Sequence, residues 1–263
     1  MVNSHFLHGS GSERAIFLNG WFERKENWLP VLPHIDERRF SIACMDYRGY
    51  GEMRDSDGPF TLAQIAEDVF DLADHLDWSR FSLVGHSMGG MAMQKALSFE
   101  PERIDKLIGI APVPANGIQF DPKTLVHFRR AVYDIDLRKD ILESSVSGRL
   151  TTTWAKRKAE SSWIHTAQQA FGDYLNEWTE QDISPTLEEI NQSVVCIIGD
   201  CDPGINKDLM QQTFAKWFFR TRVEVIQGAG HYPMEETPIA LASLIEKSLV
   251  PSDMPRIVRS GVD

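Results

Sequence analysis

The sequence predicts an α/β protein: a mostly parallel central sheet of about 6–8 strands, helices on both faces and an inserted helical lid. Two observations predict this class. Short apolar runs alternate with segments of helical periodicity, which is typical of a parallel sheet covered by helices. One stretch, residues 117–185, interrupts the alternation and contains no convincing strand. The 263 residues can bury a sizeable core without disulfide bonds.

The strands are predicted from apolar runs that lack the alternation of a half-exposed strand, so both of their faces should be covered. Between the second and third runs, a stripe of apolar residues at helical spacing predicts a helix over 62–76, with Thr61 as its cap. Residues 91–99 and 239–249 are also predicted to be helical. The predicted strands are 15–18, 40–45, 81–84, 106–111, 193–199 and 222–227.

The interrupting stretch divides the chain. We expect residues 1–116 and 186–263 to form one core and residues 117–185 to form a helical lid inserted into it. The lid sequence carries several large aromatic residues in polar surroundings. They could form the inner stripe of a helical bundle or face a substrate pocket, and both can hold at once. The candidates for substrate contact are Trp154, Trp163 and Trp178.

Composition excludes several classes of partner. A formal net charge of −11 argues against nucleic acid and against an anionic membrane surface. No apolar run approaches the length that spans a bilayer. Three cysteines without a metal-binding spacing and an N-terminus without a signal-peptide pattern predict a reduced, cytoplasmic protein. No metal or cofactor is expected, and the oligomeric state stays open.

One short motif carries the chemistry. The sequence Gly85-His86-Ser87-Met88-Gly89 lies between a predicted strand and a predicted helix. A turn this tight would leave no room for side chains at the two outer glycines, and it would display the serine at the carboxyl end of the sheet. Another kind of glycine-rich strand-to-helix turn is the alternative. The setting favours a nucleophile.

A serine hydroxyl needs a base to become nucleophilic. His231 is the candidate, because it follows the last predicted strand through the flexible Gly228-Ala229-Gly230 turn and so lies at the carboxyl end of the sheet. An acid that orients the imidazole should follow another strand. Asp200 and Asp202 both do, and one of them could instead brace the turn.

An oxyanion hole would complete the site. It needs two backbone N–H donors, one from the residue after the nucleophile and one from the loop after the first strand. Met88 fits the first position and Trp21, after Gly20, fits the second. Trp21 and its neighbour Phe22 could also be plain core aromatics; we place Phe22 with Tyr232 among the candidate substrate contacts.

Over about residues 14–249 the chain resembles the α/β-hydrolase fold family. The resemblance is carried by N-G-W at 19–21, D-Y-R-G-Y-G at 46–51, G-H-S-M-G-G at 85–90, G-D-C-D-P at 199–203 and G-H-Y-P-M-E-E-T-P at 230–238. The order Ser, Asp, His is the order of that family, and a neighbouring proline favours Asp202 over Asp200 as the acid. Two features depart from the family: Asn19 replaces the frequent histidine, and the short N-terminus implies that one or both leading antiparallel strands are reduced.

The resemblance implies a serine hydrolase that cleaves a small carboxylic ester or lactone with Ser87, His231 and Asp202. The lid aromatics would favour an apolar or aromatic acyl group. Three alternatives use the same fold: hydrolysis of a C–C bond, perhydrolysis or cofactor-free haloperoxidation, and ring cleavage by a cofactor-independent dioxygenase. In the last group the acid follows the strand after the nucleophile helix, where residues 111–117 have no carboxylate. A non-enzymatic ligand sensor is a fourth.

Overall fold

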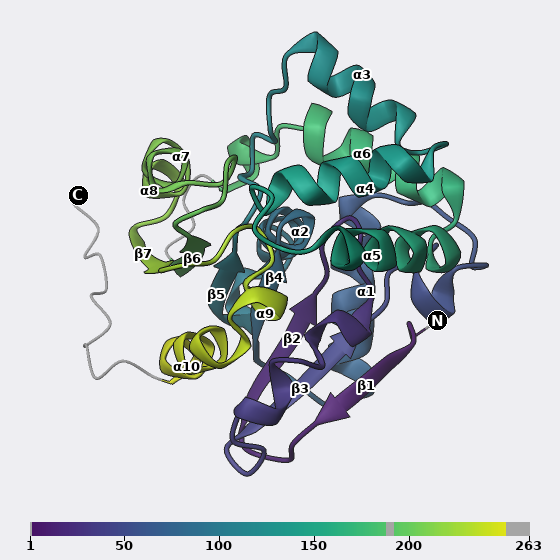
Figure 1. The fold of residues 1–263 in the computed structure, drawn as a ribbon. Helices are drawn as coiled ribbons and strands as arrows, with labels where there is room; N and C mark the ends of the chain where they lie inside the picture. The colour runs from purple at the N-terminus through teal and green to yellow at the C-terminus, as the bar shows by residue number, and fades with distance from the viewer. Residues whose placement is uncertain (1, 188–191, 251–263) are drawn as a thin grey trace.

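A computed structural model describes residues 2–187 and 192–250. Its centre is a sheet of seven strands in the order β1-β3-β2-β4-β5-β6-β7, in which β1 is antiparallel to β3 and the other pairs are parallel (Figure 1). The predicted α/β class with a mostly parallel sheet is therefore confirmed. The strands are β1 (His5–His8), β2 (Glu13–Leu18), β3 (Phe40–Met45), β4 (Phe81–His86), β5 (Ile104–Ile110), β6 (Ser193–Gly199) and β7 (Arg220–Ile226).

Each predicted strand corresponds to an observed one within a few residues. All six residues of β4 are buried, since helices cover both faces of the sheet at its centre. The strand that sequence reasoning did not predict is β1. It lies at the edge, is four residues long and contains two histidines, so it has no apolar run to reveal it. One leading antiparallel strand is thus present.

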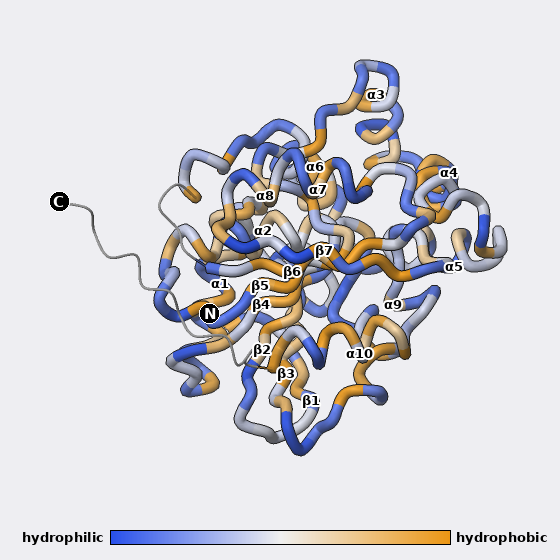
Figure 2. The backbone as a smooth tube through the Cα atoms, turned by 90° about the vertical axis from the view of Figure 1, so that its left-hand side faces the viewer, coloured by the Kyte–Doolittle hydropathy of each residue, from blue (hydrophilic) through white to orange (hydrophobic). Residues whose placement is uncertain are grey.

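Helices pack on both faces of the sheet (Figure 2). Helices α1 (Leu62–His75) and α2 (Met88–Leu97) contact each other on one face, whereas α10 (Pro238–Leu249) packs on the other, against β5, β6 and β7. The Thr61 side chain accepts a hydrogen bond from the Gln64 N–H at 3.1 Å, as predicted for the cap of α1. Helix α2 begins at Met88, three residues earlier than predicted and directly after Ser87.

Four helices fill the stretch between β5 and β6. They lie together beyond the carboxyl ends of the central strands (Figure 1), where the sequence predicts the lid. Asp121, Asp134 and Thr151 cap the first three through their side chains. The last residues of the predicted core, 251–263, lie outside the described part of the chain. The four helices are α3 (Pro122–Arg130), α4 (Ile135–Ser145), α5 (Thr152–His165) and α6 (Gln168–Glu180).

Short helices complete the fold. Two of them, α7 (Lys207–Gln212) and α8 (Phe214–Trp217), connect β6 to β7. A third, α9 (Pro233–Glu236), follows His231 directly and turns the chain toward α10. Single 3-10 turns lie at Lys25–Trp28, Leu32–His34, Gly51–Met53, Pro101–Arg103 and Ser184–Leu187.

Candidate active site

The turn between β4 and α2 displays Ser87. Its backbone has φ 51° and ψ −115°, a conformation that non-glycine residues rarely adopt and that costs free energy. The flanking glycines show why the turn must be so tight. A Cβ on Gly85 would lie 2.2 Å from the Gly89 carbonyl oxygen, and a Cβ on Gly89 would lie 2.6 Å from the Leu18 carbonyl oxygen. The tight turn therefore holds Ser87 in a strained backbone conformation that displays its hydroxyl.

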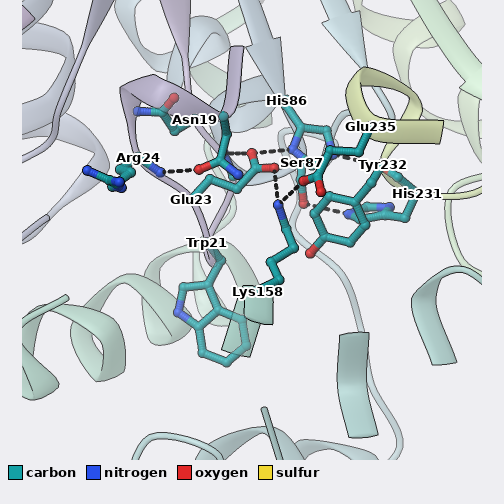
Figure 3. A network of polar contacts seen from close by, with 12 residues as sticks. Asn19, Trp21, Glu23, Arg24, His86, Ser87, Lys158, His231, Tyr232 and Glu235 are labelled. Carbon is teal, nitrogen blue, oxygen red and sulfur yellow. Dashed lines mark hydrogen bonds and ion pairs between the residues drawn. The ribbon is translucent and has the colours of Figure 1, made fainter. Parts of the chain in front are cut away.

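The structure brings three of the predicted residues together. His231 Nε2 lies 3.0 Å from Ser87 Oγ (Figure 3). Its Nδ1 lies 2.7 Å from Asp202 Oδ2. Ser87 follows β4, Asp202 follows β6 and His231 follows β7. These strands are parallel, so their carboxyl ends bring the side chains to one edge of the sheet. In this arrangement the serine hydroxyl donates to a neutral imidazole whose other nitrogen carries the proton.

Asp202 is held as a carboxylate. Its Oδ1 accepts hydrogen bonds from the Gly204 and Ile205 N–H groups, both at 2.9 Å, while Oδ2 faces the imidazole. Burial favours the neutral acid, but His231 and the two N–H donors outweigh it and lower the pKa of Asp202. Asp200 is exposed and accepts from the Gly228 N–H at 2.7 Å, which braces the neighbouring turn. The two aspartates therefore have different partners: Asp202 contacts His231, and Asp200 contacts the Gly228 N–H.

The loop that carries His231 is fixed by a second carboxylate. Glu236 accepts hydrogen bonds from the Gly230 N–H at 2.8 Å and the Tyr232 N–H at 3.0 Å, on either side of the histidine. Arg149 pairs with Glu236 and also donates to the Gly228 carbonyl oxygen. The side chain of His231 is largely buried. Burial lowers its pKa, but the charge and hydrogen bond of Asp202 raise it by more, so the net shift is upward.

The predicted oxyanion donors lie on either side of Ser87. Within the described residues, neither the Trp21 N–H nor the Met88 N–H has a hydrogen-bond partner, so both remain available to a ligand. The loop of Trp21 is itself well held. Its indole donates to the Phe171 carbonyl oxygen at 2.7 Å, and Asn19, in place of the frequent histidine, donates to the Met45 carbonyl oxygen at 2.7 Å.

A cavity of about 590 Å³ opens above these groups, a size typical of small-molecule sites. Ser87, Asp202 and His231 form part of its wall. A hollow of about 630 Å³ beside Phe60 includes none of these three residues, so the smaller cavity is the candidate active site. The apolar part of the wall comes mainly from Trp21, Phe22, Val113, Ile118, Phe120, Phe128, Ile141, Trp178, Ile205 and Tyr232.

Three of the five predicted substrate-contact residues, Phe22, Trp178 and Tyr232, line this cavity; Trp154 and Trp163 do not. The Trp154 indole donates to the Glu235 carboxylate, and its ring packs on Tyr232 with centroids 5.4 Å apart. Trp163 is 37% exposed, and its ring faces the Arg138 guanidinium at 4.9 Å. The structure therefore assigns both tryptophans to polar contacts outside the cavity.

The family model of the alpha/beta hydrolase fold matches residues 16–238, which is most of the chain. The chain belongs to this family. The match contains the serine turn and the Asp202–His231 pair, so the geometry described above lies within the shared fold. Among the described residues of this hydrolase-fold chain, no helix is long and apolar enough to cross a membrane. That part of the chain also holds no cluster of three metal-binding side chains.

The relatives of this hydrolase-fold chain include esterases and a lactonase. Pimeloyl-[acyl-carrier protein] methyl ester esterase of Edwardsiella ictaluri is 29% identical over 142 residues, and that match spans 51% of the chain and 52% of the relative. The enzyme of the same name from Serratia marcescens is 24% identical and covers 90% of the chain and 94% of its own length. The 3-oxoadipate enol-lactonase 2 of Acinetobacter baylyi is 23% identical, covering 88% and 86%.

A solved structure supports the fold. The bromoperoxidase of Bacillus anthracis superimposes with a TM-score of 0.83 at 18% identity, covering 93% of this chain and 94% of that one. At this identity the likeness concerns the hydrolase fold alone.

Sequence reasoning missed a group of ionisable side chains behind the site: the buried Glu23, His86 and Lys158 and the half-buried Glu235 (Figure 3). Their positions in the chain offered a signal for two of them. His86 directly precedes Ser87, and Glu23 comes two residues after Trp21. The other two come from α5 and α9, which only the folded chain brings near.

Proposed function

We propose that the chain is a serine hydrolase that cleaves a small carboxylic ester or lactone through an acyl-enzyme intermediate. The observation that carries the proposal is the hydrogen-bonded series Ser87, His231, Asp202 at the wall of a largely apolar cavity. The esterase and lactonase names of the relatives support the same reaction class.

Each group has a role in the proposed reaction. Ser87 Oγ attacks the carbonyl carbon while His231 Nε2 takes the hydroxyl proton, and the Trp21 and Met88 N–H groups stabilise the oxyanion. Collapse of the tetrahedral intermediate breaks the C–O bond, and His231 returns the proton to the leaving alkoxide. Water then attacks the acyl group with His231 as base, which releases the acid and restores Ser87. Asp202 holds the imidazole in the required tautomer and stabilises the imidazolium.

The cavity wall suggests the substrate class. Several of its aromatic side chains, Phe22, Phe120, Phe128 and Trp178, form the part that would contact the acyl group. We therefore propose an apolar or aromatic acyl group, and we propose that α3, α4 and α6, which supply Phe128, Ile141 and Trp178, act as the lid. Asp202, which contacts His231, follows β6. This favours hydrolysis over ring cleavage by a dioxygenase, because the dioxygenase would need its acid after β5.

A substrate panel tests the reaction class. Aryl esters, alkyl esters, lactones, a diketone and an ester with hydrogen peroxide are assayed with the wild type, Ser87→Ala and Ser98→Ala. We expect turnover of an ester or lactone that Ser87→Ala abolishes. Ser98, at the other end of α2, donates only to the Lys95 carbonyl oxygen in the described structure and serves as the matched control. Turnover that survives in Ser87→Ala, or a diketone or peroxide as the preferred reactant, would contradict the proposal.

A further inference from the structure

Four ionisable side chains, three of them buried and one half-buried, lie behind the site without taking part in the steps above (Figure 3). Glu23 follows β2, His86 ends β4, Lys158 lies on α5 and Glu235 lies on α9. Glu23, His86 and Lys158 are almost fully buried. Charged residues are rarely buried at all unless they are paired, so the cluster calls for a physical reason.

Glu23 lies at the centre of the cluster. Its Oε2 accepts hydrogen bonds from the Gly20 N–H at 2.8 Å and from His86 Nδ1 at 2.7 Å, and its Oε1 pairs with Lys158 Nζ at 3.2 Å. Burial favours the neutral acid, but His86 and Lys158 outweigh it and hold the pKa of Glu23 well below its usual range. One carboxylate therefore fixes the Asn19–Gly20 peptide group, one residue before the Trp21 N–H, and the imidazole of His86, directly before Ser87.

His86 extends the contact to the catalytic histidine. Its Nε2 lies 2.8 Å from the His231 carbonyl oxygen, while its Nδ1 faces the Glu23 carboxylate. Both partners are hydrogen-bond acceptors, so both ring nitrogens must donate, which only the imidazolium form of histidine can do. Two cations, His86 and Lys158, then balance two carboxylates, Glu23 and Glu235, in the cluster.

We propose that Glu23 and His86 are positioning residues: an ion pair that holds the Trp21 oxyanion donor and the His231 loop in place on either side of Ser87. The proposal rests on the proposed function for its kinetic consequence. Neither Glu23 nor His86 lines the cavity; the contact of the pair with its wall is the His86 ring, which packs on Tyr232 with centroids 5.3 Å apart. Loss of the pair should therefore lower kcat and leave KM nearly unchanged, because oxyanion stabilisation and proton transfer act in the transition state.

The kinetic test compares Glu23→Gln with Glu235→Gln. Both substitutions remove a carboxylate that pairs with Lys158, but Glu235 contacts neither Gly20 nor His86. We expect Glu23→Gln to lower kcat on the order of 100-fold, the cost of misplacing a reacting group by about 1 Å, with KM nearly unchanged. Glu235→Gln should lower kcat far less. Equal effects of the two variants, or an effect of Glu23→Gln on KM alone, would overturn the proposal.

A spectroscopic test of the wild type remains available where Glu23→Gln fails to fold. The wild type with ¹⁵N-labelled histidine rings is examined by NMR at neutral pH, and His86→Gln assigns the His86 signals. We expect both ring nitrogens of His86 to carry a proton. An unprotonated nitrogen would refute the ion pair. This readout needs no turnover, so its failure is distinct from a failure of the proposed hydrolase, which is marked by activity that survives in Ser87→Ala.

Discussion

At the scale of single residues, two aspartates on one turn have different surroundings. Asp202 is buried, accepts two N–H donors and faces His231, whereas Asp200 is exposed and holds the Gly228 N–H. Position along the chain left both candidates open, because each follows the same strand, and it was the family resemblance, with its neighbouring proline, that favoured Asp202. Asp202 is buried and Asp200 is exposed because the loop that carries His231, after β7, packs next to Asp202.

The Asp202–His231 pair predicts a pH profile. The pKa of His231 is raised above the ordinary value of 6.5 because the Asp202 carboxylate outweighs burial. The base must be neutral, so kcat/KM of the wild type should rise with pH through a midpoint above 6.5. Asp202→Asn should move this midpoint to lower pH and reduce kcat on the order of 10⁴-fold, since an amide favours the wrong imidazole tautomer.

Asp200→Asn is the control for that measurement. It removes an exposed carboxylate from the same turn, so the midpoint and kcat should stay near the wild-type values. The measurement is the profile of kcat/KM against pH for an aryl ester, recorded for the wild type, Asp200→Asn and Asp202→Asn. A large loss in Asp200→Asn with a small one in Asp202→Asn would reverse the assignment.

At the scale of elements, the tryptophans of α5 and α6 have different partners. Trp178 on α6 lies in the cavity wall with Trp21 and Phe128, at centroid distances of 5.7 Å and 5.9 Å. Trp154 and Trp163 on α5 turn to Glu235 and to Arg138. Helical periodicity predicted the helices but not which side of each faces the cavity, since polar partners on other elements decide this for α5.

Trp178→Phe should therefore change acyl-group selectivity. Within the described residues the Trp178 indole N–H has no hydrogen-bond partner, so phenylalanine removes ring volume without breaking a hydrogen bond. The larger cavity should raise the kcat/KM ratio of bulky to short esters by about tenfold, the scale of a methylene or two in an apolar pocket.

Trp163→Phe is the matched control for this selectivity change, because Trp163 lies outside the cavity wall and should leave the ratio unchanged. The ratio is measured for both variants with the same pair of aryl esters. A shift in Trp163→Phe without one in Trp178→Phe would contradict this view of the cavity.

At the scale of the whole molecule, the features predicted from the sequence are those that a short stretch of residues determines by itself. The central strands carry apolar runs because they are covered on both faces, and the glycines around Ser87 mark a turn that no larger residue allows. The edge strand β1 and the buried Glu23–His86 pair were not predicted. Their formation depends on contacts between distant segments, such as β1 with β3 and Glu23 with His86, which leave no periodic signal in the chain.

The proposed reaction requires Ser87 to carry the acyl group during turnover, and this intermediate can be trapped. The enzyme is mixed with a slowly deacylated aryl ester and quenched in acid, and intact mass and peptide digests are measured. We predict one acyl group, replacing the Ser87 hydroxyl hydrogen, on the peptide that contains Ser87, and none in Ser87→Ala. Ester hydrolysis with no acyl group on that peptide, or with the group on another residue, would contradict the account.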